Sequence, residues 1–447
     1  MRRAILSGFP SLALTLVAGC GDGNKTNPTQ ADSRTDDAAA LPRQVCAADN
    51  GGIVLPTGFC ASVFADALGR ARHMAVTPSG DVFVAIDPPP MPPTPPGNTA
   101  PGHVVALRDA DHDGIAEVHQ TIADAGGNGI AWADGFLYVA SDDRIVRYTL
   151  PDGQLMPTSG PDVIVSGLPS TGDHHRKTVV LVGGSLYVNI GSATNACQVA
   201  NRMPLSPGIE PCPELATRAG IWKFTASVLG QTLADGTRFA TGMRNANALG
   251  ADGSGTLWVA LNGRDQLADN WPALFTPAQD MQLPSEEIYP VHEGDDHGWP
   301  YCYHDPVRHQ MMLAPEYGGD GATVGRCAQA ATPTLTMPAH WAPLSIAFNS
   351  RDRFPARFQG AAFIANHGSR FDMNAVGDPG YNVVMIPFAN GAPDGNWENF
   401  ATGFTAGGTP LPDAARYRPV GVTAMPDGTI LISDDKVGRI WKVTYQP

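Results

Sequence analysis

Basic residues are scarce in this sequence. Its 447 residues include 29 Lys and Arg against 43 Asp and Glu, which gives a formal net charge of −14 at pH 7. A chain with this charge repels the phosphate backbone, so non-specific nucleic-acid binding is excluded as its function. If such a chain holds an anionic ligand, its few arginines must gather in one place.

Several motifs of common enzyme classes are missing. The sequence has no Gly-x-Ser-x-Gly, no phosphate-binding P-loop and no Gly-x-Gly-x-x-Gly that opens a helix. It also has no Cys-x-x-Cys-His and no cysteine and histidine spacing typical of zinc sites. Serine hydrolase, nucleotide-binding, c-type haem and zinc-binding functions therefore have no support.

Long hydrophobic runs are confined to the N-terminus. Residues 1–19 begin with two arginines and continue as an apolar stretch, which is typical of a signal peptide. The letters VAGC that end this stretch predict a lipobox, in which Cys20 becomes the lipidated N-terminus. Cleavage by an ordinary signal peptidase, with Cys20 incidental, is the alternative. No later run is long enough to span a bilayer, so the lipid would be the only membrane contact.

The sequence from Cys20 onward divides into a tether and a folded domain. Residues 20–44 are polar and small, and they predict a flexible tether. Residues 45–447 carry the apolar segments that a core requires. We therefore expect an exported protein, lipid-anchored and facing the periplasm or the cell surface.

The cysteines are informative because disulfides persist in exported proteins. Six follow Cys20, namely Cys46, Cys60, Cys197, Cys212, Cys302 and Cys327. Six cysteines allow fifteen connectivities. We expect pairing between sequence neighbours, 46 with 60, 197 with 212 and 302 with 327, because each pair would close one local loop.

Turn-forming residues are abundant, with 50 Gly and 40 Pro, so many turns and few long helices are expected. One pattern recurs: a β-rich run, a tight turn of Pro, Asp, Ser or Gly, and a second β-rich run. It begins near Met74, Gly129, Val179, Ala248, Leu344 and Gly421. Six such hairpins, several followed by another short strand, predict an all-β fold, a six-bladed β-propeller. A β-sandwich or two barrels is the alternative.

A histidine precedes the third hairpin, in the run DHHRK that starts at Asp173. A loop before a strand reaches the rim or the central mouth of a propeller, where a histidine such as His174 can act as a general base. A solvated surface histidine is the alternative.

Arginines precede the fourth and the last hairpin. Arg244 is followed by Asn245, while Arg416 and Arg418 stand two residues apart on a segment expected to be extended. Side chains at such spacing point to the same side, and guanidinium groups match the geometry of carboxylates. In an acidic chain these arginines predict an anion site. Surface arginines beside local aspartates are the alternative.

The run DADHDG places carboxylates at alternate positions, Asp109, Asp111 and Asp113, followed by a glycine. Such a loop can wrap one hard cation. The twelfth position of an EF-hand loop would be Gln120, which excludes an EF-hand. A structural calcium loop and a simple acidic hairpin turn both stay open.

Taken in order, these motifs resemble the soluble glucose/sorbosone dehydrogenases, a family that depends on pyrroloquinoline quinone (PQQ). The similarity runs from about Val54 to Tyr445 and rests on short motifs in a shared order. The matching segments are Asp173-His174, Gly242-Met243-Arg244-Asn245, Gly298-Trp299-Pro300-Tyr301 and Arg416-Tyr417-Arg418.

The chain departs from the glucose branch of that family at two positions. Ser192 stands where that branch has a cofactor-site Asp, and His367 stands near its cofactor-binding Lys. The run from His367 to Ser369 is instead similar to the His-Gly-Ser of the sorbosone branch, which the chain resembles more.

The resemblance implies an oxidoreductase that oxidises a sugar or a sugar-derived alcohol or aldehyde by hydride transfer to PQQ. It implies that His174 is the catalytic base. The residues implied to bind PQQ are Asp173, Arg244, Asn245, His367, Arg416 and Arg418. It also implies a calcium ion held mainly by main-chain oxygens near Gly263 and Arg264. The expected partners are a small sugar and an electron acceptor, a periplasmic cytochrome or a quinone.

A function of a different class also stays open. Six-bladed propellers also serve as calcium-dependent lactonases and as binding modules. A propeller without PQQ would be a carbohydrate-binding lipoprotein or a calcium-dependent lactonase. Turnover of sugars after reconstitution with PQQ distinguishes these functions from the dehydrogenase.

Overall fold

The computed structural model describes residues 44–89, 102–349, 352–371 and 379–447. These residues lie within one unit of the chain, Pro42–Pro447. The predicted signal peptide, the lipidation site Cys20 and all but the last residue of the predicted tether lie outside them. Across the described residues, no helix has the length and apolar character needed to cross a membrane.

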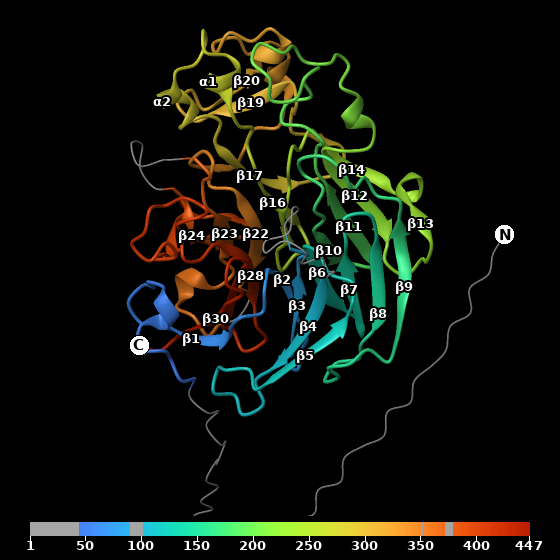
Figure 1. Cartoon of the computed structure of the whole chain (residues 1–447), viewed down its shortest axis with the longest axis vertical. Helices are drawn as coiled ribbons and strands as arrows, with labels where there is room; N and C mark the ends of the chain where they lie inside the picture. The colour runs from blue at the N-terminus through green and yellow to red at the C-terminus, as the bar shows by residue number, and fades with distance from the viewer. Residues whose placement is uncertain (1–43, 90–101, 350–351, 372–378) are drawn as a thin grey trace, which may run out of the picture. The chain divides into compact units, whose positions relative to one another are not determined.

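Six sheets of four or five strands form the six blades of a β-propeller (Figure 1). The first strands of the blades are β2 (Ala71–Val76), β6 (Gly129–Ala133), β10 (Val179–Val182), β15 (Ala248–Ala251), β22 (Pro343–Phe348) and β28 (Pro419–Ala424). The second strands are β3 (Val82–Ile86), β7 (Phe136–Ala140), β11 (Ser185–Ile190), β16 (Leu257–Leu261), β23 (Ala362–His367) and β29 (Ile430–Asp434). The third strands are β4 (His103–Arg108), β8 (Ile145–Thr149), β12 (Gly220–Thr225), β17 (Glu286–Val291), β24 (Tyr381–Ile386) and β30 (Ile440–Tyr445). The fourth strands are β5 (Val118–Ala123), β9 (Ser159–Ser166), β14 (Thr237–Thr241), β21 (Leu335–Met337), β27 (Glu398–Ala401) and β1 (Phe59–Ala65).

Smaller elements complete the fold. Short strands β13 (Gln231–Thr232) and β18 (Asp295–Asp296) add parallel edges to the second and third blades. Two isolated hairpins pair β19 (Cys302–Asp305) with β20 (Gln310–Leu313) and β25 (Phe388–Ala389) with β26 (Ala392–Pro393). The helices are short: α1 (Leu267–Asn270), α2 (Pro277–Asp280), and 3-10 turns at Asn50–Gly52, Pro213–Ala216, Leu233–Asp235, Pro315–Tyr317, Gly325–Gln329 and Ala356–Phe358.

The blades form a closed ring. Each first strand contacts the first strands of its two neighbours, and β28 of the last blade contacts β2 of the first. The N-terminal strand β1 completes the last blade by pairing antiparallel with β30, with Phe59 opposite Tyr445. Both ends of the described chain therefore meet in one sheet, which closes the ring without an unpaired strand between its ends.

The six predicted hairpins are confirmed as the first two strands of the six blades, so the propeller prediction is confirmed. Many of these strands lack the alternation of buried and exposed side chains that a half-buried hairpin would show. Every residue of β3 and of β16 is buried. Each blade is covered by a neighbour on both faces, so its central strands bury both faces and read as continuous apolar runs.

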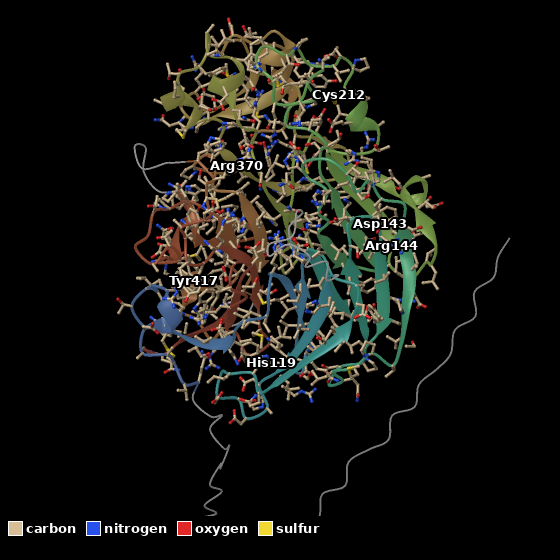
Figure 2. All side chains as sticks on the ribbon, viewed as in Figure 1. His119, Asp143, Arg144, Cys212, Arg370 and Tyr417 are labelled. Carbon is tan, nitrogen blue, oxygen red and sulfur yellow. A yellow bond between two sulfur atoms is a disulfide. The ribbon has the colours of Figure 1, made fainter. Side chains whose placement is uncertain are left out.

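An insertion in the fourth blade, around α1, α2, β19 and β20, rises beyond the ring (Figure 1, yellow and orange). The loop between β11 and β12, which contains Cys212, packs beside it (Figure 2). Trp299 contacts the cysteine pair 197 and 212 there. The predicted disulfides are confirmed as 46–60, 197–212 and 302–327. Two of them lie in this region, where the blades do not supply a core.

Candidate functional site

A cavity of about 380 Å³ lies at the end of the propeller where loops precede the first strands and follow the second strands. Its lining residues are Asp173, His174, Arg202, Arg244, Asn245, Asn262, Gly263, Asp265, Glu286, His340, Ala342, His367, Gly368, Arg370, Phe371 and Arg418. This volume falls within the range of small-molecule sites. The lining is strongly polar, with four arginines among its side chains.

Hairpin geometry explains why residues far apart in sequence meet here. In an antiparallel hairpin, the start of the first strand lies beside the end of the second. His174, Arg244 and Arg418 precede β10, β15 and β28, whereas Asp265 and Arg370 follow β16 and β23. Since the first strands form the ring, all these loops project from the same end of the propeller.

His174 is positioned by main-chain and side-chain contacts with Ser192. The His174 amide donates to the Ser192 carbonyl at 3.2 Å, and its Nδ1 lies 3.1 Å from that carbonyl and 2.9 Å from Ser192 Oγ. Ser192 Oγ itself donates to the carbonyl of Thr194 at 2.6 Å. Both Ser192 atoms therefore accept from Nδ1–H, which leaves Nε2 of His174 as the unprotonated nitrogen.

The surroundings of His174 keep it neutral. Burial lowers its pKa well below the ordinary value of 6.5, and the charge of Arg244 lowers the pKa further. Gly191 permits this placement, because a Cβ there would lie 2.6 Å from the Cβ of His174. A neutral imidazole with a bare Nε2 in a polar cavity can accept a proton from a ligand hydroxyl.

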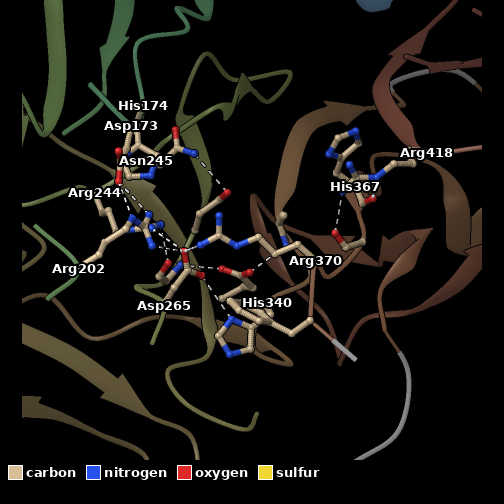
Figure 3. Close-up of a pocket in the computed structure, with 16 residues that line it drawn as sticks. Asp173, His174, Arg202, Arg244, Asn245, Asp265, His340, His367, Arg370 and Arg418 are labelled. Atoms are coloured by element: carbon tan, nitrogen blue, oxygen red, sulfur yellow. Dashed lines mark hydrogen bonds and ion pairs between the residues drawn. The ribbon is translucent and has the colours of Figure 1, made fainter. Parts of the chain in front are cut away.

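Asp265 is the centre of an arginine cluster (Figure 3). Its Oδ2 accepts from Arg244 at 3.1 Å, from Arg202 at 3.3 Å and from Arg370 at 2.7 Å. Desolvation opposes the charge of this carboxyl, but Arg244 and the other cations hold its pKa well below its usual range. One carboxylate thus holds three guanidinium groups together without neutralising them all.

Arg418 and His367 lie across the cavity from His174 and Arg244 (Figure 3). Arg418 donates to the main-chain carbonyls of His367 and Gly368 at 3.0 and 3.1 Å. Within the described residues it makes no ion pair with a carboxylate, so its charge is not neutralised by direct contact. His367 Nε2 contacts the buried Asp435 at 2.9 Å, which fixes its ring.

Glu286 and His340 form the floor between these groups. Glu286 accepts from the amides of Gly263 at 2.7 Å and Ala342 at 2.9 Å, and burial raises its pKa to about 7. His340 Nε2 donates to the carbonyl of Asp280 at 2.7 Å, and its Nδ1 lies 3.5 Å from Asp265. Although burial opposes its charge, Asp265 raises the pKa of His340 above its ordinary value.

Most of the residues predicted from sequence for this site line the cavity. They are Asp173, His174, Arg244, Asn245, Gly263, His367 and Arg418. Asp173 accepts from Arg202 Nε at 2.9 Å, so it orients an arginine of the cluster. Among the described residues, the buried Asn245 Oδ1 has no hydrogen-bond partner, which leaves an acceptor in the cavity wall.

The structure does not bring the other predicted residues to the cavity. Arg416 is exposed and lies over the ring of Tyr417, with its guanidinium carbon 5.0 Å from the ring centre. The expected shared direction of Arg416 and Arg418 requires a regular strand, but β28 begins only at Pro419. The side chain of Arg264 is buried in an ion pair with Glu316 at 2.5 Å, away from this cavity.

The predicted metal loop containing Asp109, Asp111 and Asp113 joins β4 to β5 and contributes no residue to this cavity. Lys177 is also turned away from it. Its Nζ donates to the carbonyl of Pro169 at 2.8 Å and to that of His175, and burial lowers its pKa to about 7.

Sequence reasoning missed five charged or aromatic residues of the site: Arg202, Glu286, His340, Arg370 and Phe371. It placed a calcium ion near Gly263 and Arg264 but assigned no role to the side chain of the adjacent Asp265. His340 could have been found, because it precedes the fifth hairpin as His174 and Arg244 precede theirs. Arg202 has no comparable signal, since it lies in the loop closed by the 197–212 disulfide.

Comparisons with known proteins agree with this architecture. The holo form of the pyranose dehydrogenase PQQ domain from Coprinopsis cinerea superposes with a TM-score of 0.69, at 18% identity over 91% of this chain and 99% of that one. The calcium structure of a Trichoderma reesei enzyme of family AA12 gives 0.69 at 21% identity over 88% and 97%. The PQQ-bound aldose sugar dehydrogenase from Streptomyces coelicolor gives 0.52 at 16% identity over 88% and 99%. At these identities the likeness is one of fold.

A curated relative is an uncharacterised protein from Borreliella burgdorferi, 27% identical over 198 residues. The match takes in 43% of this chain and 44% of the relative, so the chain spans less than half of that relative's length. Membership in the sorbosone branch stays a prediction. The family model described as TrAA12-like matches residues 53–446, nearly the whole propeller, and the chain therefore belongs to the TrAA12-like family.

Proposed function

We propose that this chain is an oxidoreductase that oxidises a sugar or a sugar-derived alcohol or aldehyde with PQQ as its cofactor. The observation that carries the proposal is the arginine-rich cavity in an otherwise acidic chain. Arg202, Arg244, Arg370 and Arg418 face the cavity, whereas the whole chain carries a net charge of −14. Such a concentration of guanidinium groups selects a ligand with several carboxylates.

The donor set of the cavity fits PQQ, which carries three carboxylates. Asp265 neutralises one positive charge of the cluster, and Asp173 a second. Among the described residues, the Arg418 guanidinium donates to carbonyls and not to a carboxylate, so its positive charge stays available to an anion. Arg202, Arg244, Arg370 and Arg418 would hold the carboxylates. When bound, PQQ supplies the oxidising power by taking up a hydride from the substrate carbon.

His174 would serve as the base for the substrate hydroxyl. Its Nδ1–H is hydrogen-bonded to Ser192, so Nε2 would take up the proton of the substrate hydroxyl. The hydride would leave the carbon that bears this hydroxyl. The lowered pKa keeps Nε2 bare at neutral pH. Arg244 repels the resulting imidazolium, which favours release of the proton once the reaction is complete.

The calcium ion implied near Gly263 and Arg264 does not fit the contacts of that segment. The carbonyl of Gly263 accepts from the Arg244 guanidinium at 2.6 Å, so a positive charge already occupies that oxygen. Both oxygens of the neighbouring Glu286 accept from main-chain amides. We therefore assign no chemical step in the cavity to calcium.

The names of two structural relatives support the proposal. One is the holo form of a pyranose dehydrogenase PQQ domain, and the other is a PQQ-bound aldose sugar dehydrogenase. Both relatives share the propeller fold with this chain over most of their length. The cavity described above lies at the mouth of this chain's propeller.

Reconstitution tests the proposal. Purified protein is incubated with PQQ, with and without calcium, and reduction of an artificial dye is followed over a panel of aldoses. The expected result is dye reduction that requires added PQQ. Sugar binding without turnover would favour the carbohydrate-binding module, and lactone hydrolysis without PQQ would favour the lactonase.

We also propose that the chain is exported and anchored through a lipid on Cys20, where a periplasmic cytochrome or a quinone would accept its electrons. Three disulfides support an oxidising compartment. Growth with labelled palmitate tests the anchor. The label is expected in the parent protein and should be absent from a Cys20→Ala variant. Equal labelling of the two proteins would contradict the lipid anchor at Cys20.

A further inference from the structure

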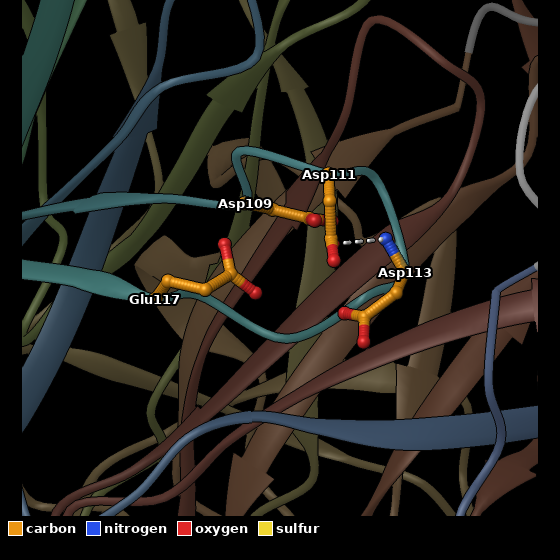
Figure 4. Close-up of side chains that lie close together, drawn as sticks. All are labelled: Asp109, Asp111, Asp113 and Glu117. Carbon is orange, nitrogen blue, oxygen red and sulfur yellow. Dashed lines mark hydrogen bonds between the residues drawn. The ribbon is translucent and has the colours of Figure 1, made fainter.

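The turn between β4 and β5 gathers four carboxylates: Asp109, Asp111, Asp113 and Glu117. One ligand atom from each lies within 4.8 Å of the corresponding atoms of the others (Figure 4). The sequence pattern includes the three aspartates, and the structure adds Glu117, which immediately precedes β5. Four negative charges this close repel one another unless a cation lies between them.

Asp109 supplies an independent sign of a missing partner. Its side chain is only 6% exposed, and its Oδ1 is buried without a hydrogen-bond partner among the described residues. The other oxygen, Oδ2, accepts from the Gly114 amide at 3.0 Å and contacts Lys442 Nζ at 3.2 Å. Figure 4 shows the Asp109 carboxylate directed toward Asp111, into the cluster. A buried charged oxygen left without a partner is costly, and such groups normally bind a donor or a metal.

We propose that this turn is a calcium-binding site. All four side chains offer hard oxygen atoms, and calcium accepts six to eight oxygen ligands in irregular arrangements. Lys442 contributes one positive charge against four negative ones, so a divalent cation still reduces the local excess. The site is separate from the cavity and does not depend on the proposed oxidation of sugars.

The surroundings of the turn give the cation a structural role. The carbonyl of Gly114 accepts from Ser62 Oγ in β1 at 2.5 Å, and the Ala116 amide donates to the carbonyl of Phe64 in β1 at 2.8 Å. Lys442 belongs to β30. The turn of the first blade is therefore docked on the two strands that complete the last blade. A cation bound here would fasten the first blade to the last, where the ring closes.

Calcium binding and thermal unfolding of the protein without PQQ test this site. The parent and the Asp111→Asn/Asp113→Asn variant are freed of metal with a chelator and titrated with CaCl2. Asparagine keeps the side-chain oxygens that accept from main-chain amides of the turn, but it removes two negative charges. The parent is expected to bind one more calcium ion than the variant, and saturating calcium should raise the parent's Tm by about 2–6 °C more.

The control is Asp152→Asn/Asp320→Asn, which removes two carboxylates from exposed turns outside the cluster. It should bind calcium like the parent. Should the double variant at the turn not fold, Glu117→Gln replaces it and should weaken calcium affinity at least about tenfold. Equal stoichiometry and equal Tm shifts in the parent and the turn variant would overturn the proposal.

Discussion

His174 and His175 are neighbours with the same chemistry, and only their contacts separate them. His174 faces the cavity with Nδ1 bound to Ser192, whereas His175 Nδ1 contacts the carbonyl of Gly172 at 3.0 Å and its Nε2 lies 3.6 Å from Asp142. A general base must present an unprotonated nitrogen to its substrate. Both rings donate from Nδ1 to a carbonyl, so the difference between the two residues is one of direction: Nε2 of His175 lies beside Asp142, whereas His174 lines the cavity.

Substitution of these two histidines tests the assignment of the base. His174→Ala should lower sugar turnover by about 10²–10⁴-fold, because it removes the proton acceptor, while the affinity for PQQ stays close to that of the parent. His175→Ala should cost far less. Steady-state dye reduction and a PQQ titration measure the two effects, and a larger loss for His175→Ala would contradict the assignment.

The pH profile tests the same group without a substitution. Because burial lowers the pKa of His174 well below 6.5, Nε2 stays unprotonated as the pH falls through 6.5. The acid limb of kcat/KM is therefore expected below pH 6.5, and protonation at lower pH should abolish turnover. An acid limb at or above pH 6.5 would show that another group titrates.

Arg416 and Arg418 form a matched pair for the anion site. Arg418→Ala should weaken PQQ binding by about one to two decades, because a charge-assisted hydrogen bond is lost. Arg416→Ala should leave PQQ affinity unchanged, since Arg416 is exposed and lies over Tyr417. Fluorescence titration with PQQ measures both affinities. Equal losses would show that Arg416 also reaches the cofactor.

At the scale of elements, β17 combines a structural role with two adjacent buried acids. Glu286 and Glu287 begin this strand, and burial raises the pKa of each to about 7. Glu286 accepts main-chain amides of the site, whereas Glu287 accepts from the hydroxyl of Tyr289 at 2.7 Å. Both acids are tolerated in the core because donors surround them and because they can hold a proton.

Glu287→Gln tests this account through stability. A raised pKa means that the folded state binds the proton more tightly than the unfolded one. The protonation of Glu287 therefore contributes fully to the free energy of unfolding below about pH 4.5, and this contribution is lost as the pH rises through about 7. Glutamine resembles the protonated acid at every pH. The variant should therefore exceed the parent's free energy of unfolding by less than about 1 kcal/mol at pH 5 and by up to about 3 kcal/mol at pH 8.

Urea unfolding at the two pH values measures this difference. The exposed Glu293→Gln, in the same blade, should show no such pH-dependent gain. A gain of the same size at pH 5 and pH 8 would mean that the substitution stabilises the strand by another route.

Some strands of each blade can be predicted from the sequence more readily than others. The first two strands of each blade are predictable because a tight turn joins two apolar runs. Outer strands such as β14 and β27 are short, polar and interrupted by irregular pairing, with register shifts opposite each. Their formation depends on the edge that the preceding strand offers, so their own residues carry little signal.

At the scale of the whole molecule, stability depends on the closure of the ring. The last blade takes its fourth strand from the N-terminal β1, and the disulfide between Cys46 and Cys60 ties the preceding segment to that strand. Phe59 of β1 lies against Phe354, Phe358 and Phe400 with ring centres 4.9 to 5.2 Å apart. The closing strand therefore joins the last blade to the core of the fifth.

Removal of the closing strand tests this dependence. A chain that begins after Ala65 should show a lower Tm and stronger aggregation, because the edge of β30 and the aromatic cluster become exposed. A chain that begins at Gln44 should keep the Tm of the parent. Differential scanning calorimetry and light scattering measure the outcomes, and equal Tm values for both truncations would contradict a role for β1 in closure.

Local sequence patterns were enough to predict the number of blades, the disulfide pairs and many residues of the cavity wall. Repeated hairpins, neighbouring cysteines and polar residues before each hairpin are local patterns, and hairpin geometry places such residues at one end of the ring. The arginine cluster and the direction of Arg416 depend instead on how the blades pack together. Arg202 and Arg370 reach Asp265 only because loops of different blades converge, and Arg416 turns outward because its segment is not yet a strand. Contacts between loops of distant sequence depend on how the blades close, which no local pattern encodes.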